Sequence, residues 1–152
     1  MDTVEQTTEK TLVLTRIFNA PRALVFKAWT DPDRAAVWWG PQGFATLSCQ
    51  MDVRTGGAWR IRMRSPEGTT HTKRGIYQEI VPPERLVFTW AWEDADGVPG
   101  HETLVTIHLE DHGQATKLTL HQAVFESATS RDAHRTGWSS CFERFTAYLA
   151  QT

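Results

Sequence analysis

The side chains best suited to catalysis or metal binding are those of six histidines and two cysteines. Their spacing matches no familiar catalytic or metal-binding motif. His108 and His112 are four residues apart, but one falls in an expected strand and the other in the following turn. A zinc site needs three or four converging ligands. Cys141 and His134 are seven residues apart on one expected helix, about 10 Å along its axis, too far for a direct hydrogen bond. We therefore expect no metal ion and no cofactor.

Glycine and serine motifs of enzymes are equally weak in this sequence. Gly56-Gly57 precedes a strand pattern, which is typical of a hairpin turn and not of a phosphate-binding loop. No GxSxG motif is present to expose a nucleophilic serine. Gly137 is more informative, because it lies inside an expected helix, where glycine costs about 1 kcal/mol relative to alanine. It either permits close packing beside Trp138 or leaves space for a ligand.

Seven tryptophans are a large number for a chain of 152 residues. Each indole offers a wide apolar face and one N–H donor. Tryptophans of this kind can form a bulky core, and they can equally form the walls of a cavity.

The first 40 residues predict one strand and two short helices. Residues 11–18 alternate apolar and polar side chains, as a half-buried strand does. Asn19–Pro21 then indicates a helix start, with Asn as the cap and Pro in the first turn. Thr30–Pro32 repeats this signal, and the second helix should end near Trp38, before Gly40-Pro41.

Residues 43–122 predict six antiparallel strands, because short alternating segments are separated by Gly-, Pro- and Asp-rich turns. In one strand Trp59, Ile61 and Met63 share a face, opposite a row of arginines at positions 60, 62 and 64. Such a sheet has one apolar face, which needs a cover.

The C-terminal segment predicts that cover. Trp138, Phe142, Phe145 and Leu149 recur at offsets of 0, 4, 7 and 11, which is helical spacing. A helix of about 20 residues starting at 127–130 spans about 30 Å, enough to cross a small sheet. The expected architecture is α+β, with a curved antiparallel sheet wrapped around a long C-terminal helix.

Composition places the protein in an ordinary class. The chain is 40% hydrophobic and 22% charged with a formal net charge of −2. These values predict one domain over residues 1–152, with residues 1–10 as a flexible tail, and argue against a nucleic-acid partner. Without a signal peptide or a span of about 18 apolar residues, we expect a cytoplasmic protein with free thiols and no membrane span.

Several segments resemble the family of activator of heat-shock-protein-90 ATPase homologue-like proteins, in the START-like (SRPBCC) superfamily. They cover nearly the whole chain: RIFNAPRALVFKAWTDP from Arg16, WWGPQGF from Trp38, DVRTGGAWR from Asp52, GIYQEIVPPERLVFTW from Gly75, TLVTIHLE from Thr103 and HRTGW from His134. The resemblance implies a helix-grip fold, as in START-like and Bet v 1-like proteins, with a cavity between the sheet and the last helix. The family takes its name from eukaryotic co-chaperones. The sequence resembles only the C-terminal domain of those proteins and not the N-terminal domain with which they bind the chaperone. It transfers no catalytic residue.

The expected function is non-catalytic binding of a small, mostly apolar ligand, lipid- or polyketide-like, in that cavity. Aromatic side chains would form its walls, and a few polar side chains would orient the ligand. The expected ligand-binding residues are Trp38, Trp39, Phe44, Trp59, Met63, Arg74, Tyr77, Trp90, Trp92, His121, Trp138 and Phe142.

Two other functions stay open. A protein-interaction module, with a chaperone or another protein as partner, predicts an exposed surface patch and a filled core. A cyclase or hydrolase would need a titratable side chain turned into the cavity, for which His121 and Asp52 are the candidates.

Overall fold

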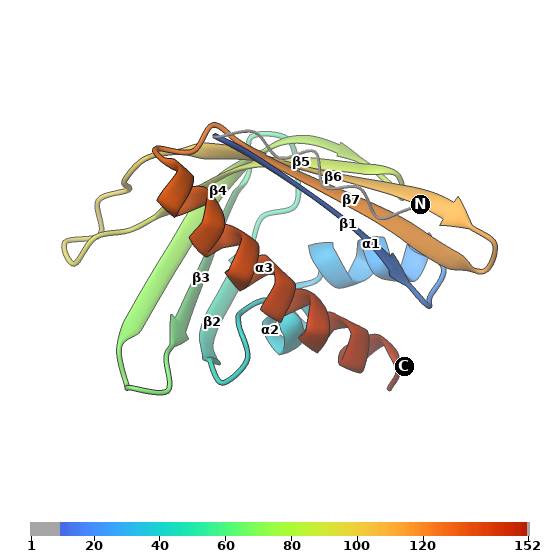
Figure 1. Cartoon of the computed structure of the whole chain (residues 1–152), viewed down its shortest axis with the longest axis horizontal. Helices are drawn as coiled ribbons and strands as arrows, with labels where there is room; N and C mark the ends of the chain where they lie inside the picture. The colour runs from blue at the N-terminus through green and yellow to red at the C-terminus, as the bar shows by residue number, and fades with distance from the viewer. Residues whose placement is uncertain (1–9, 152) are drawn as a thin grey trace.

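A computed structural model describes residues 10–151 and confirms the expected order of elements: one strand, two short helices, six strands and a long helix (Figure 1). Residues 1–9, most of the expected tail, lie outside the described part. The elements are β1 (Thr11–Phe18), α1 (Arg22–Thr30), α2 (Pro32–Trp38), β2 (Ala45–Met51), β3 (Ala58–Arg64), β4 (Thr70–Val81), β5 (Arg85–Trp92), β6 (Thr103–His112), β7 (Ala115–Ala123) and α3 (Ala128–Leu149).

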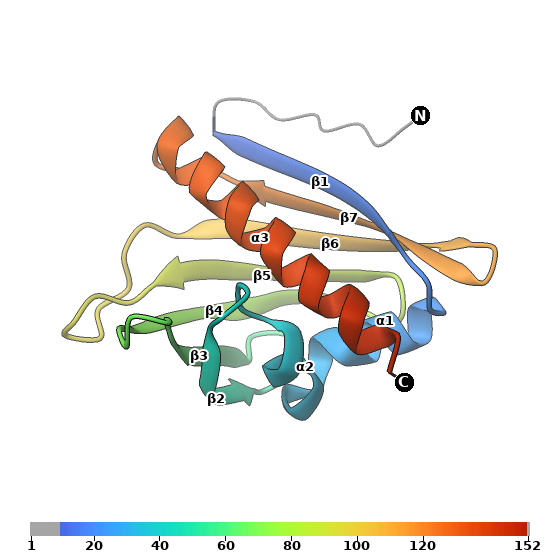
Figure 2. The ribbon, with the colours of Figure 1, turned by 60° about the horizontal axis from the view of Figure 1, so that its bottom comes forward.

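The strands form one antiparallel sheet in the order β1-β7-β6-β5-β4-β3-β2. The first strand pairs with the last, from Thr11 opposite Ala123 to Phe18 opposite Thr116. The sheet bends, and α3 runs diagonally across its inner face (Figure 2). The α+β helix-grip architecture is therefore confirmed. Within residues 10–151, no helix is both long enough and apolar enough to cross a membrane.

Two of the three helices begin as their sequence signals predict. The Asp31 side chain accepts a hydrogen bond from the backbone N–H of Asp33 at the start of α2, and Ser127 does the same for Ser130 at the start of α3. The prediction that Asn19 caps α1 is wrong. The cap position is Pro21, in extended conformation and without a side-chain hydrogen bond, so Asn19 lies two residues too early.

The predicted apolar stripe of α3 is buried against the sheet. Trp138, Phe142, Phe145 and Leu149 are all at most 6% exposed. Phe145 stacks on Trp38 of α2, with ring centres 4.2 Å apart. The C-terminal half of α3 therefore rests on a tightly packed aromatic core.

A buried chain of hydrogen bonds attaches the middle of α3 to the sheet. The indole N–H of Trp138 donates to Gln122 Oε1 at 2.8 Å, and Gln122 Nε2 donates to Thr103 Oγ1 at 2.8 Å. Thr103 Oγ1 in turn donates to the carbonyl oxygen of Trp90 at 3.1 Å. The side-chain polar atoms of Trp138, Gln122 and Thr103 are thus paired with one another or with the backbone, as buried polar groups usually are. The chain sets where Trp138 lies above β5, β6 and β7.

Gly75 of β4 is the position where the sheet tolerates no side chain. A Cβ there would lie 1.7 Å from the carbonyl oxygen of Thr89 and 2.4 Å from Trp59 Nε1. We expect Gly75→Ala to lower the free energy of unfolding by about 3 kcal/mol or more, because backbone must move to relieve the overlap. Urea denaturation measures the change.

Gly137→Ala is the matched control, because a Cβ at that helical position meets no atom within 4 Å. It should raise stability by about 0.5–1 kcal/mol, since alanine favours helix. Equal effects of the two substitutions would contradict the close approach at Gly75.

Candidate ligand-binding cavity

A cavity of about 160 Å³ lies between the N-terminal half of α3 and strands β3 to β5. Indole rings, one amine, one imidazole and one thiol face it, and the surrounding wall is apolar. It is lined by Trp39, Pro41, Met63, Lys73, Trp90, Trp92, Ser130, Ala133, His134, Gly137, Trp138 and Cys141.

Four tryptophans form most of the wall. Trp39 follows α2, stacks on Trp59 of β3 with centres 5.1 Å apart, and lies 5.9 Å from Trp138 of α3. Trp90 and Trp92 of β5 meet edge to face at 4.6 Å. Trp92 lines the cavity and is 40% exposed, so its ring forms the side of the cavity that is open to solvent. These contacts hold the rings in fixed positions, so the apolar wall is preorganised.

Gly137 leaves part of this space open. A Cβ on Gly137 would have no neighbouring atom within 4 Å, so close packing does not explain this glycine. The alternative, that its missing side chain leaves room in the cavity, agrees with its place in the lining.

Lys73 is the most unusual residue of the cavity, because its side chain is buried with the residue only 3% exposed. Its Nζ lies 5.1 Å from the centre of the Trp39 ring, a cation–π distance. Among residues 10–151, this amine has no hydrogen-bond or ion-pair partner. Buried charges are normally paired, whereas the Lys73 side chain faces the cavity, where water or a ligand can accept its hydrogen bonds.

Burial changes the acidity of the three titratable groups that face the cavity. Desolvation lowers the pKa of Lys73 to about 8 and that of His134 to about 4, with the nearby Lys73 charge adding to the effect on His134. Burial also raises the pKa of the Cys141 thiol. At neutral pH the imidazole and the thiol are therefore uncharged, and Lys73 brings the only positive charge into the cavity wall.

Five of the predicted ligand-binding residues do line the cavity: Trp39, Met63, Trp90, Trp92 and Trp138. Five other predicted residues do not line the cavity. Trp38, Trp59 and Phe142 are buried in the aromatic core beside the cavity, and Phe44 is half-buried near His71. Tyr77 is 2% exposed, and its hydroxyl has no hydrogen-bond partner in the described part of the chain.

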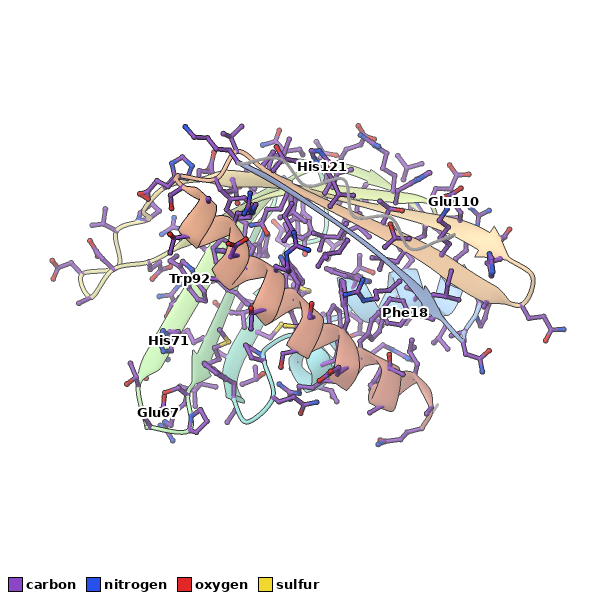
Figure 3. All side chains as sticks on the ribbon, in the orientation of Figure 1. Phe18, Glu67, His71, Trp92, Glu110 and His121 are labelled. Atoms are coloured by element: carbon purple, nitrogen blue, oxygen red, sulfur yellow. The ribbon has the colours of Figure 1, made fainter. Side chains whose placement is uncertain are left out.

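Arg74 and His121 do not face the cavity as predicted. His121 points away from α3 (Figure 3), and Arg74 follows the inward-facing Lys73 on β4, so it lies on the outer face of the sheet. Arg74 is exposed and lies 3.6 Å from the carboxylate of Glu93. His121 is exposed between two buried neighbours on β7. Asp52, the other candidate for an enzyme, is exposed and pairs with Arg54 at 2.9 Å.

Sequence reasoning missed Lys73, Pro41, Ser130, Ala133 and His134 as cavity residues, and assigned Cys141 only to the core. Two signals could have found three of them. Lys73 lies four residues before Tyr77, so both share a face of β4 by the two-residue period of a strand. His134 and Cys141 lie four residues before and three after Trp138, on one helical face.

The unpaired amine predicts that Lys73→Met stabilises the protein at pH 7. Lys73 has a pKa of about 8 when folded, against an ordinary 10.5. Below pH 8 it is protonated in both states, so the penalty of burying the charge is complete. That penalty shrinks as the pH rises from 8 to 10.5. We expect Lys73→Met to raise the free energy of unfolding by about 1–3 kcal/mol at pH 7 and by less at pH 10.

Urea denaturation at both pH values tests this, with exposed Lys27→Met as the control. A methionine variant that is less stable than wild type at pH 7 would show that the amine contributes to stability.

Comparison with other proteins agrees with this architecture. The family model described as "Activator of Hsp90 ATPase homolog 1-like protein" matches residues 19–150. No curated protein matches the chain. A crystal structure of a Silicibacter pomeroyi protein of the same family is 29% identical, with a TM-score of 0.84, covering 93% of this chain and 98% of that one.

Two further solved structures extend the comparison. A Chromobacterium violaceum protein is 31% identical with a TM-score of 0.79, covering 91% of this chain and 95% of that one. An Arthrobacter aurescens protein has a TM-score of 0.86 at 22% identity, covering 98% and 92%, and shows the likeness of fold alone. With its fold, its cavity and a family match over residues 19–150, the chain belongs to the activator of Hsp90 ATPase homolog 1-like family.

Proposed function

We propose that this protein binds a small and mostly apolar molecule in the cavity between α3 and the sheet, without catalysing its conversion into a product. The observation that carries this proposal is one cavity lined by four indole rings and by a buried amine that has no hydrogen-bond or ion-pair partner among residues 10–151. Concave apolar walls with a few polar groups are typical of small-molecule sites.

The volume limits the size of the molecule. An engineered lysozyme cavity of about 150 Å³ accepts benzene, and the cavity here measures about 160 Å³. One aromatic ring or a short branched hydrocarbon therefore fits inside. A lipid- or polyketide-like ligand would have to extend through the mouth past Trp92, or displace α3 from the sheet.

Lys73 favours a ligand with one hydrogen-bond acceptor. An ammonium group that meets a carboxylate or a carbonyl oxygen in apolar surroundings forms a strong, charge-assisted hydrogen bond. His134 and Cys141 add no negative charge that would compete for Lys73. The ligand we propose thus places its apolar part against the indoles and its acceptor near Nζ.

A protein partner is a second candidate, supported by the family description, which refers to activators of the Hsp90 ATPase. A protein partner would not need the cavity.

We also propose a cytoplasmic location, with which the two free thiols, Cys49 and Cys141, are compatible.

Filling the cavity from α3 should abolish ligand binding without loss of the fold. Gly137→Leu places an apolar side chain where no atom lies within 4 Å, in a residue type that favours helix. We expect wild type to bind benzyl alcohol or benzoate with a dissociation constant on the order of 1 mM or lower, about −4 kcal/mol. The variant should bind at least about tenfold more weakly, by isothermal titration calorimetry.

Ala147→Leu is the matched control, because Ala147 is exposed on the same helix, away from the cavity. It should bind like wild type. The proposal fails if wild type binds no molecule of this size, or if Gly137→Leu binds as well as wild type does.

A further inference from the structure

We propose that the Nζ amine of Lys73 forms an imine with a small aldehyde or ketone held in the cavity. This inference rests on the proposed function, because the cavity must first bind the apolar part of the molecule. It goes beyond that function by assigning a covalent step and a chemical class, small carbonyl compounds, to the site.

The geometry around Lys73 favours nucleophilic attack. The side chain lies on the inner face of β4, lines the cavity, and is held above the Trp39 ring at 5.1 Å. No carboxylate of the described chain pairs with it. Among the described residues that line the cavity, Lys73 is the one with an amine, so a carbonyl compound held there meets a single amine nucleophile.

The charge state of Lys73 supports the same conclusion. A lysine reacts only as the neutral amine, and desolvation in an apolar site is an established way to make that form available. Burial lowers the pKa of Lys73 to about 8. The titratable groups around it are Cys49 on β2 and His134, Cys141 and Arg144 on α3. None of them is a carboxylate that would restore the charge.

The reaction needs no oxidant or reductant. The nitrogen lone pair attacks the carbonyl carbon, an N–C bond forms, and a proton passes from nitrogen to the carbonyl oxygen to give a carbinolamine. The C–O bond then breaks with loss of one water molecule as the C=N bond forms. Water entering past the exposed Trp92 reverses the reaction, so the capture is reversible.

Reductive trapping tests the inference. The full chain is incubated with benzaldehyde and sodium cyanoborohydride at pH 7.5, and the mass of one N-benzyl group is located by peptide mapping with a protease that does not cleave at lysine. We expect Lys73 to be labelled at least about tenfold faster than exposed Lys27 in the same sample, since one pKa unit changes the neutral fraction about tenfold. Labelling of Lys73 should level off as the pH rises above 8, because its amine is then already mostly neutral.

Variants separate this inference from the proposed function. Lys73→Arg keeps a positive charge without a nucleophilic amine and should give no adduct in the cavity, whereas Lys27→Met should leave labelling at Lys73 unchanged. Gly137→Leu should lose the adduct because the cavity is filled. Benzyl alcohol, which has no carbonyl group, reports non-covalent binding in the same proteins.

Two results would overturn the inference in different ways. If benzyl alcohol binds but Lys73 is labelled no faster than Lys27, the covalent step is wrong and the binding cavity stands. If neither benzyl alcohol nor benzaldehyde occupies the cavity, both the inference and the proposed function are wrong.

Discussion

The packing of two consecutive indole rings between the sheet and α3 is the constraint on which the rest of the structure depends. Trp38 and Trp39 stack at 5.8 Å and nearly parallel. Trp38 meets Phe145 of α3, and Trp39 meets Trp59 of the sheet. Because the rings are rigid and the packing is dense, α3 cannot move closer to the strands. Toward the N-terminal half of α3, Gly137 supplies no side chain to fill the space between the helix and the strands. The cavity is the space that this arrangement leaves unfilled.

The two faces of the sheet differ in electrostatic environment, and the consecutive residues Lys73 and Arg74 of β4 lie on opposite faces. On its outer face, Glu93 accepts two hydrogen bonds from Arg60, at 2.7 and 2.8 Å, and lies 3.6 Å from Arg74. On its inner face, Lys73 has an indole ring as its neighbour and pairs with no carboxylate of residues 10–151. Arg74 is therefore an ordinary paired cation, whereas desolvation makes Lys73 a weaker base. Both proposals for function derive from this difference between two consecutive residues.

The errors in the predicted site have a single geometric cause. Arg74 and Tyr77 are three residues apart, so in a regular strand they face opposite sides. Placing both in the cavity required a bulge between them. The bulge in β4 lies beyond Tyr77, between Tyr77 and Glu79, and the pairing of residues 73–77 with β5 is regular. The pairing of β7 is likewise regular throughout, so His121 stays on the face opposite Leu120. The family resemblance contributed the cavity itself but no residue within it.

The periodic patterns of the sequence alone determined the helices, the strands and the buried stripe of α3, because period and turn chemistry are local properties of the chain. The start signal of α2 and the positions of the turns are local in the same sense. Only the tertiary structure decided that Lys73 is buried without a counter-ion and that the space beside Gly137 stays open. The volume of a cavity is the space that distant elements enclose minus the volume of the side chains that fill it. A local sequence pattern cannot predict this volume, because it depends on how β3, β4, β5 and α3 pack together.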